Sequence, residues 1–287
     1  MTSEILELKE VAIEALNKTY KVHEELGPKG EEKIQKNQFG ETALKFDIEA
    51  ERTVIDTLKQ AKIPIRIVSE EHGTVDIVKR PKYLGVLDGL DGSFLYKKER
   101  GVGRYGTMFA IFSNLDPTYD DYIFNGIMEH SPSPRSFVAS KGEGSFMLAD
   151  KRKTQTHCSN VFSLTKNTKI YIDEAFDKTL RTTIIHDTFV SKLRGYRTKS
   201  MVSSAVHYAD LVSGETDLVL EATGKYNLEK AVAYGLIVEA GGVLVELDGT
   251  SIGPKKYWSF GQKDYIPVIG ASTQELAKEL IKHISRK

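Results

Sequence analysis

The chain has 287 residues, and its 40 lysines and arginines balance 40 aspartates and glutamates, so it lacks the net charge typical of proteins that bind nucleic acid or anionic membranes. Its single cysteine, Cys158, excludes an intramolecular disulfide, and without a cluster of cysteines and histidines a structural zinc site is not expected. Glutamates interrupt the N-terminal segment and no apolar run is long enough to span a bilayer, so we expect a cytoplasmic protein whose partner is a small molecule.

The first predicted elements are two amphipathic helices. Apolar residues at steps of three and four predict a helix over residues 5–20, which ends near a Gly-Pro-Lys-Gly breaker. A second helix is predicted over residues 45–61, with Asp47 in its first turn. Two short apolar runs follow, and both end in acids and glycine. We predict that they are strands, which deliver Glu70 and Asp88 at their carboxyl ends.

The remaining elements predict a layered α+β structure. Strand-like stretches over 105–113, 120–131 and 134–148 indicate a largely antiparallel sheet, followed by a polar connection over 149–160. We predict two subdomains: residues 1–150 with this sheet and the metal-binding motifs, and an α/β unit over residues 151–287 that completes the site. In the second unit we predict strands over 168–176, 216–222, 243–249 and 265–272, and helices over 186–195, 203–214, 227–242 and 272–287.

One stretch in the first half concentrates the chemistry. Asp88 and Asp91 lie three residues apart in LGVLDGLDGS, directly behind an apolar run. A carboxylate buried alone in low dielectric tends to be neutralised, so two of them imply a shared cation. The N–H groups of Gly92 and Ser93 at the bend offer donors for phosphate, and Mg²⁺ prefers oxygen ligands. We therefore predict a metal and phosphate site formed by these residues, Glu70 and a more distant acid.

Two other interpretations apply to the same stretch. Asp-Gly is first of all a turn dipeptide, so a plain turn explains the pattern taken alone. An EF-hand calcium loop would place Glu99 at its twelfth position, counted from Asp88. That interpretation fails at Leu90, Gly92 and Ser93, where the loop requires acid or amide, acid or amide, and glycine.

Four motifs occur in order, namely TALKFD, SEEHG, DGLDGS and LEKAVAYGLIVEAGG. With them the sequence resembles the inositol monophosphatase family, within the wider group of lithium-sensitive, metal-dependent sugar phosphatases that includes fructose-1,6-bisphosphatase. The resemblance implies an αβαβα sandwich of that type. Three positions depart from the family pattern: Gly89 stands where the family has proline, Leu228 where it has tryptophan, and Glu229 where it has aspartate.

The resemblance implies a set of metal ligands. Glu70 and Asp88 would bind a first Mg²⁺, with Asp88 bridging to a second ion held by Asp91 and Glu229, and with the Leu90 carbonyl as a further ligand. Two or three Mg²⁺ ions and inhibition by Li⁺ are implied for each site. Glu229 reaches about one methylene farther than aspartate, which matters where octahedral geometry at ~2.1 Å is required. Alternatively, Glu229 is only a first-turn helix acid favoured by the helix dipole.

The resemblance also implies catalytic and phosphate-binding residues. Asp47 and Ser93 would orient the water that attacks phosphorus, and with Glu70 they form the expected catalytic set. Gly92 and Ser93 would bind the phosphate through their N–H groups, which stabilises negative charge during in-line displacement.

Substrate identity is the most open question. Glu221 corresponds to an acid that accepts hydrogen bonds from substrate hydroxyls in inositol phosphatases, which favours a polyol. Arg197, Lys199, Lys225 and Tyr226 lie in segments that frame the leaving group, where a basic cluster would hold a second phosphate; alternatively they are plain surface residues.

The function implied is a Mg²⁺-dependent phosphomonoesterase that acts on small polyol or sugar phosphates. The alternatives are a fructose-1,6-bisphosphatase or dual-activity enzyme, a 3'-phosphoadenosine 5'-phosphate phosphatase, and a non-catalytic homologue that binds metal or sugar. The resemblance further implies a homodimer or homotetramer.

Overall fold

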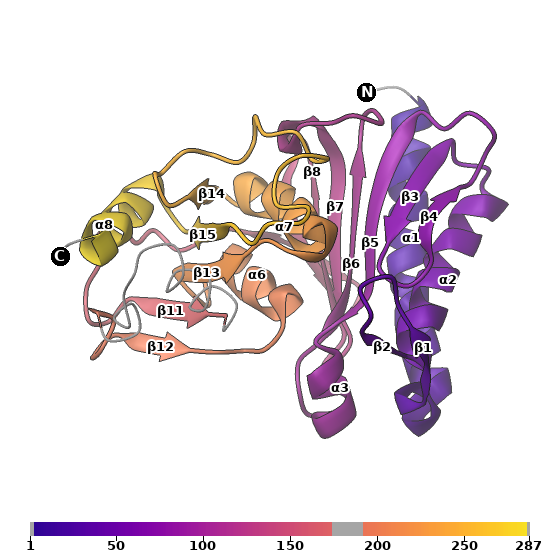
Figure 1. Cartoon of the computed structure of the whole chain (residues 1–287), viewed down its shortest axis with the longest axis horizontal. Helices are drawn as coiled ribbons and strands as arrows, with labels where there is room; N and C mark the ends of the chain where they lie inside the picture. Colours follow the sequence, from indigo (N-terminus) through magenta and orange to yellow (C-terminus); the bar gives the residue numbers. More distant parts are fainter. Residues whose placement is uncertain (1–2, 174–191, 286–287) are drawn as a thin grey trace.

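Helices and sheets alternate in layers (Figure 1). The structure is a computed structural model that describes residues 3–173 and 192–285. Two long helices cover one face of a large sheet, two further helices lie between this sheet and a smaller one, and the last helix covers the far face of the smaller sheet. This arrangement confirms the layered α+β fold, an αβαβα sandwich, expected from the sequence. The helices are α1 (Ser3–Leu26), α2 (Lys45–Gln60), α3 (Ser93–Glu99), α6 (Ser204–Val212), α7 (Leu228–Glu239) and α8 (Gln274–Ser285).

The large sheet contains β3 (Ile65–Ser69), β4 (Gly73–Asp76), β5 (Tyr83–Asp91), β6 (Gly106–Phe112), β7 (Tyr122–Glu129), β8 (Arg135–Ser140), β9 (Gly144–Ala149) and β10 (Arg152–Thr156). Their order in the sheet is β10-β9-β8-β7-β6-β5-β3-β4. Only β3 and β5 pair in parallel, so the largely antiparallel sheet is confirmed. Every residue of β6 and β7 is buried because helices cover both faces of the sheet.

The small sheet contains β11 (Lys169–Ile172), β12 (Arg197–Lys199), β13 (Leu218–Ala222), β14 (Val243–Glu246) and β15 (Pro267–Ala271). Their order is β12-β11-β13-β15-β14, with parallel pairing around β11 and antiparallel pairing around β15. The strands predicted over 168–176, 216–222, 243–249 and 265–272 therefore form this one sheet, although the first is shorter than predicted among the described residues.

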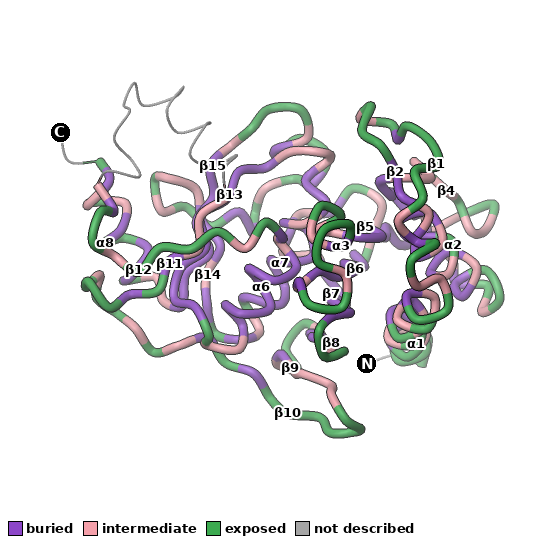
Figure 2. The backbone as a smooth tube through the Cα atoms, turned by 90° about the horizontal axis from the view of Figure 1, so that it is seen from below, coloured by how far each residue is buried: buried purple, intermediate pink, exposed green. Residues whose placement is uncertain are grey.

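Three apolar clusters separate the layers, and Figure 2 shows their buried residues running through the centre of the molecule. Leu8, Ala12 and Leu16 of α1 pack with α2 against the outer face of the large sheet. The middle cluster joins the other face of that sheet to α6 and α7. Leu276 and Leu280 of α8 pack against the small sheet. Burial on both sides of α6 and α7 fixes the helices that face the acid-rich end of β5.

Two parts of the sequence interpretation need correction. Residues 149–160 are not only a connection, because Arg152–Thr156 forms β10 at the edge of the large sheet. The turn before it has Asp150 and Lys151 at positive φ, as a two-residue hairpin requires, and an edge strand tolerates the polar sequence that disguised it. A hairpin of β1 (Lys33–Lys36) and β2 (Thr42–Leu44) was also missed.

Most of the helix predicted over 186–195 lies outside the described residues. The other predicted helices are confirmed by α1, α2, α6, α7 and α8. Within residues 3–173 and 192–285, no helix combines the length and the apolar composition needed to cross a membrane.

Candidate active site

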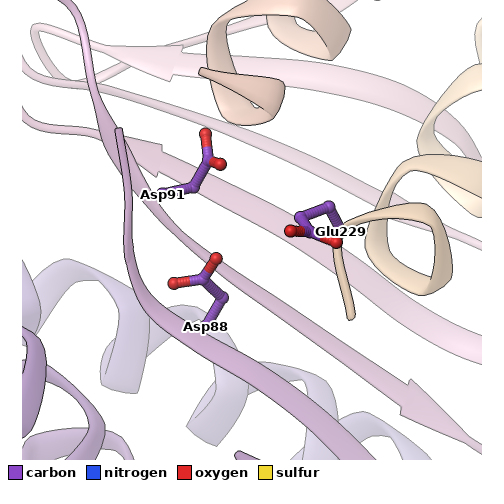
Figure 3. A group of neighbouring side chains, drawn as sticks. All are labelled: Asp88, Asp91 and Glu229. Carbon is purple, nitrogen blue, oxygen red and sulfur yellow. The ribbon is translucent and has the colours of Figure 1, made fainter. Parts of the chain in front are cut away.

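A β-bulge brings Asp88 and Asp91 to one side of the sheet. Residues three apart on a regular strand point to opposite faces. Here Asp88 pairs with Met108 and Asp91 pairs with Gly106, so β5 contains one more residue than β6 across this interval. The extra residue turns both carboxylates toward the start of α7, where Figure 3 shows Glu229 facing them. Carboxylate oxygens of Asp88, Asp91 and Glu229 lie within 4.8 Å of one another. We call these three residues the acid cluster.

Gly89 lies inside the bulge, and its lack of a side chain is required there. A Cβ atom at this position would lie 2.4 Å from the Asp47 carbonyl oxygen and 2.8 Å from Cγ of Glu51, both on α2. The Thr107 hydroxyl donates a hydrogen bond of 2.7 Å to the Gly89 carbonyl. Gly89 therefore permits the close packing of α2 against β5. The hydrogen bond from Thr107 restrains the Gly89 peptide, as a proline ring would at this position of the family pattern.

Asp91 is held by the start of α6. The Ser203 hydroxyl and the Ala205 backbone N–H donate hydrogen bonds of 2.5 and 2.7 Å to the same Asp91 oxygen, Oδ2. These contacts fix the carboxylate while leaving its other oxygen free for the cluster. Ser203 was not identified from the sequence, because its contact with Asp91 spans the two halves of the chain.

Glu51 fixes the loop that carries Glu70. It is fully buried on α2, and its carboxylate accepts hydrogen bonds from the backbone N–H groups of Glu70, Glu71 and His72 at 2.9–3.2 Å. The His72 ring lies 2.8 Å from the same carboxylate. Sequence reasoning missed this residue, although its spacing of four from Asp47 places both acids on one face of the helix.

Glu70 lies beside the acid cluster rather than within it. Its Oε1 atom accepts hydrogen bonds from Asn37 Nδ2 at 3.1 Å and from the Lys225 ammonium at 3.2 Å. The group of three residues whose oxygens lie within 4.8 Å does not include it. The sequence predicted Glu70 as a metal ligand and catalytic residue, and this role stays a prediction.

The positive charge of the protein does not fully balance the negative charge of Glu70, Asp88 and Asp91. Burial, opposed by Lys225 and reinforced by Glu229, raises the pKa of Glu70 to about 8. Burial is also the main reason that the pKa of Asp88 lies well above its ordinary value and that the pKa of Asp91 is about 6. Carboxyl groups with such pKa values gain most from an added cation, because it restores the charge balance that burial removed. The all-oxygen donor set fits a hard divalent ion such as Mg²⁺.

The expected catalytic and phosphate-binding residues lie around this cluster. Asp47 is buried in the first turn of α2 and accepts a hydrogen bond of 2.6 Å from the Leu44 N–H. Ser93 begins α3 and is exposed, and Gly92 before it has a φ of 92° that favours glycine. No hydrogen bond joins Asp47 to Ser93 in the described part of the chain. Their shared water therefore stays a prediction.

The Leu90 carbonyl also stays a predicted ligand. The residue is buried in the bulge, and its N–H donates a hydrogen bond of 2.9 Å to Asp88 Oδ1. This bond orients the Asp88 side chain within its own loop.

A pocket of about 260 Å³ opens beside the acid cluster. Asp91 and Glu229 form part of its wall, and Glu221, Lys225 and Lys230 line it together with His207, Tyr265 and smaller residues. The pocket therefore has carboxylates and lysines in one lining, a combination that suits a phosphorylated ligand together with a cation.

Glu221 in this pocket lies among polar and charged neighbours. Its Oε1 atom lies 2.5 Å from His207 Nδ1 and accepts a 2.9 Å hydrogen bond from the Ser204 hydroxyl, and its Oε2 atom pairs with Lys230 at 2.8 Å. Burial alone would raise the pKa of Glu221, but Lys230 and His207 lower it below its ordinary value. Sequence reasoning found Glu221 and missed Lys230, whose charge inside an apolar helical pattern was the available signal.

The other predicted substrate residues lie apart. Arg197 and Lys199 are exposed on β12, and neither is among the described residues that line the pocket. Tyr226 lies next to Lys225, and its ring contacts Phe39 of the β1–β2 hairpin, with ring centroids 5.0 Å apart. Their roles in substrate binding stay predictions.

Comparison with known proteins identifies a family that matches the whole chain. The model of the inositol monophosphatase family matches residues 1–287. A curated relative, the bifunctional NADP phosphatase/NAD kinase of Methanococcus maripaludis, is 24% identical over 237 residues. The match covers 78% of this chain and 40% of the relative, so the chain spans about two fifths of that protein's length.

Solved structures share the fold. The extragenic suppressor protein suhB from Bartonella henselae superposes with a TM-score of 0.73 at 17% identity, covering 96% of this chain and 98% of that one. Fructose-1,6-bisphosphatase from Leishmania major gives 0.70 at 18% identity, covering 96% and 94%. Inositol monophosphatase from Anabaena gives 0.69 at 17% identity, also covering 96% and 94%. At these identities the likeness establishes the fold.

Proposed function

The chain belongs to the inositol monophosphatase family, and from that premise we propose that it is a phosphomonoesterase that depends on a divalent metal ion. The observation that carries the proposal is the acid cluster: three carboxylates from β5 and α7 converge within 4.8 Å at the wall of a pocket. The phosphatase names of the matched relatives support the same reaction class.

In this proposal Asp88, Asp91 and Glu229 hold the ion. Bound Mg²⁺ supplies a water of lowered pKa and positive charge for the phosphate oxygens. Asp47 and Ser93 accept and orient the hydrogens of the attacking water. The N–H groups of Gly92 and Ser93 donate to the phosphate, at the start of α3 where helix geometry leaves them unpaired.

We propose a small polyol or sugar phosphate as the substrate class. The pocket volume of about 260 Å³ and its polar lining support a ligand of this size. Lys225 and Lys230 line the pocket but already pair with Glu70 and Glu221, so they offer a second phosphate group little free positive charge. NADP is a second candidate, because the matched relative from Methanococcus maripaludis is named as an NADP phosphatase.

We also propose Mg²⁺ as the native ion, with inhibition by Li⁺, and a homodimer or homotetramer in the cytoplasm. The support for these statements is the family membership.

A phosphate-release screen tests the proposal. We would assay inositol monophosphate, fructose 1,6-bisphosphate, adenosine bisphosphate and NADP, each with Mg²⁺ and with a chelator. We expect turnover of at least one ester with Mg²⁺, no turnover with chelator, and loss of turnover in Asp91→Asn. Asp116→Asn is the matched control, since Asp116 is exposed and pairs with Lys256 at the surface. Metal-independent turnover, or none with any ester, would contradict the proposal.

A further inference from the structure

An unusual backbone segment leads into α7. After β13, residues Lys225, Tyr226 and Asn227 have φ angles of 43°, 61° and 56°. A single non-glycine residue in this left-handed region is uncommon, and three in succession cost free energy that the surrounding structure must supply. Such a conformation is kept where it positions a side chain that the site uses.

Contacts on both sides hold the segment. The Tyr226 carbonyl accepts a hydrogen bond of 3.1 Å from Gln262 Nε2. The Asn227 side-chain amide donates to the Tyr119 hydroxyl and, at 3.4 Å, to the Phe260 carbonyl. With its backbone fixed, Lys225 extends toward the loop that follows β3.

The Lys225 ammonium lies between two glutamates. It is 3.2 Å from Oε1 of the buried Glu70 and 2.7 Å from Oε2 of Glu41, which lies on the β1–β2 hairpin. By contrast, within residues 3–173 and 192–285 no lysine or arginine forms an ion pair with the acid cluster. The protein thus pairs its own cation directly with Glu70, whereas Lys225 acts on Asp88 and Glu229 only by electrostatic attraction without an ion pair.

We infer that the Lys225 ammonium replaces one divalent ion, the one that the family pattern assigns to Glu70 and Asp88. This inference rests on the proposed function, because it concerns the same metal centre. The ammonium is a compact charge with three donors, and it is present at any metal concentration. A divalent ion on Glu70 would have to displace the 3.2 Å contact and would be repelled by the ammonium. The acid cluster is then the remaining metal site.

Counting bound ions tests the inference without substrate. We would measure Mn²⁺ bound per chain by equilibrium dialysis for the wild type, Lys225→Met and the control Lys256→Met, whose lysine is exposed and remote. We expect Lys225→Met to bind one ion more than the wild type, and Lys256→Met to match the wild type. The same number of ions in Lys225→Met and wild type would overturn the inference.

A second variant keeps the test decisive if Lys225→Met folds poorly. Glu70→Gln in the wild-type background should leave the ion count unchanged, whereas Asp91→Asn should lower it. Loss of an ion in Glu70→Gln would overturn the inference, because Glu70 would then be a metal ligand. If the numbers of bound ions are as expected but no ester is hydrolysed, only the proposed function is contradicted. If the enzyme is active but Lys225→Met and the wild type bind the same number of ions, only this inference is contradicted.

Discussion

The site has two groups of carboxylates, the acid cluster and Glu221, and they differ in the positive charge around them. In the acid cluster, burial raises the pKa of Asp91 to about 6 and the pKa of Asp88 well above its ordinary value, and no lysine or arginine among the described residues forms an ion pair with these acids. At Glu221, Lys230 and His207 overcome the effect of burial, and the pKa falls below its ordinary value. Burial alone therefore does not identify a metal site. The supply of protein cations distinguishes a centre that receives ions from one that is already neutralised.

The largest expected effect comes from removing a charge in the acid cluster. Asp88→Asn should lower kcat/KM for phosphate release by about 10³-fold or more, because the cation would lose a central ligand. The fold should persist in the absence of metal, since the variant removes a buried charge that repels its neighbours. Phosphate release and circular dichroism check both parts, with Asp116→Asn as control. Activity within tenfold of the wild type would contradict the assignment.

Removing the Lys230 ammonium tests the role of positive charge at Glu221. Lys230→Met should lower the free energy of unfolding by about 3 kcal/mol, because it leaves the Glu221 carboxylate buried without its ammonium partner. The exposed Lys256→Met should change it by less than about 0.5 kcal/mol. Urea unfolding measures both variants. Adding Glu221→Gln to Lys230→Met should recover part of the loss, and equal effects at both lysines would refute the distinction.

A packing change tests how the acid cluster is positioned. Gly89→Ala would place a Cβ atom 2.4 Å from the Asp47 carbonyl oxygen, so α2 or the bulge must move. We expect a loss of about 2 kcal/mol in unfolding free energy and weaker Mg²⁺ binding, from overpacking in a closely packed region. Urea unfolding and calorimetric titration are the measurements. Unchanged stability with unchanged Mg²⁺ affinity would show that the close approach of α2 is not needed.

The two groups also predict opposite pH dependence. Glu70 and Asp91 have folded pKa values above their ordinary ones, so their stabilising contribution is complete below the ordinary values and is lost as the pH rises through about 6 and 8. In chelator, we expect the unfolding free energy to fall from pH 5 to pH 8 by at least about 1.4 kcal/mol, which equals one pKa unit at one carboxyl. Glu221 behaves in the opposite way, because its contribution is lost only as the pH falls.

Urea unfolding at several pH values checks this prediction. Saturating Mg²⁺ should reduce the part of the fall that comes from Asp91, and Glu70→Gln should reduce the part that comes from Glu70. An unfolding free energy that rises between pH 5 and pH 8 without metal would contradict the raised pKa values of Glu70 and Asp91.

The sequence was sufficient where the signal is local. Apolar runs that end in acids predicted the strands and the closeness of Asp88 and Asp91, and the family resemblance added Glu229. The bulge was not predictable, because it depends on how β5 pairs with β6. Glu51 and Lys230 were missed for a similar reason, since their partners lie on other elements that only folding brings close. The sequence showed Gly89 only as a departure from the family pattern, and the packing of α2 against it explains why glycine is required.

A crystal soaked in Mn²⁺ and measured for anomalous scattering tests the central claim most directly, because one map covers both groups of carboxylates. We predict a peak bounded by Asp88, Asp91 and Glu229, and no peak at Glu221, where Lys230 already supplies the charge. A map without a peak at the acid cluster, or with one at Glu221, would contradict the account.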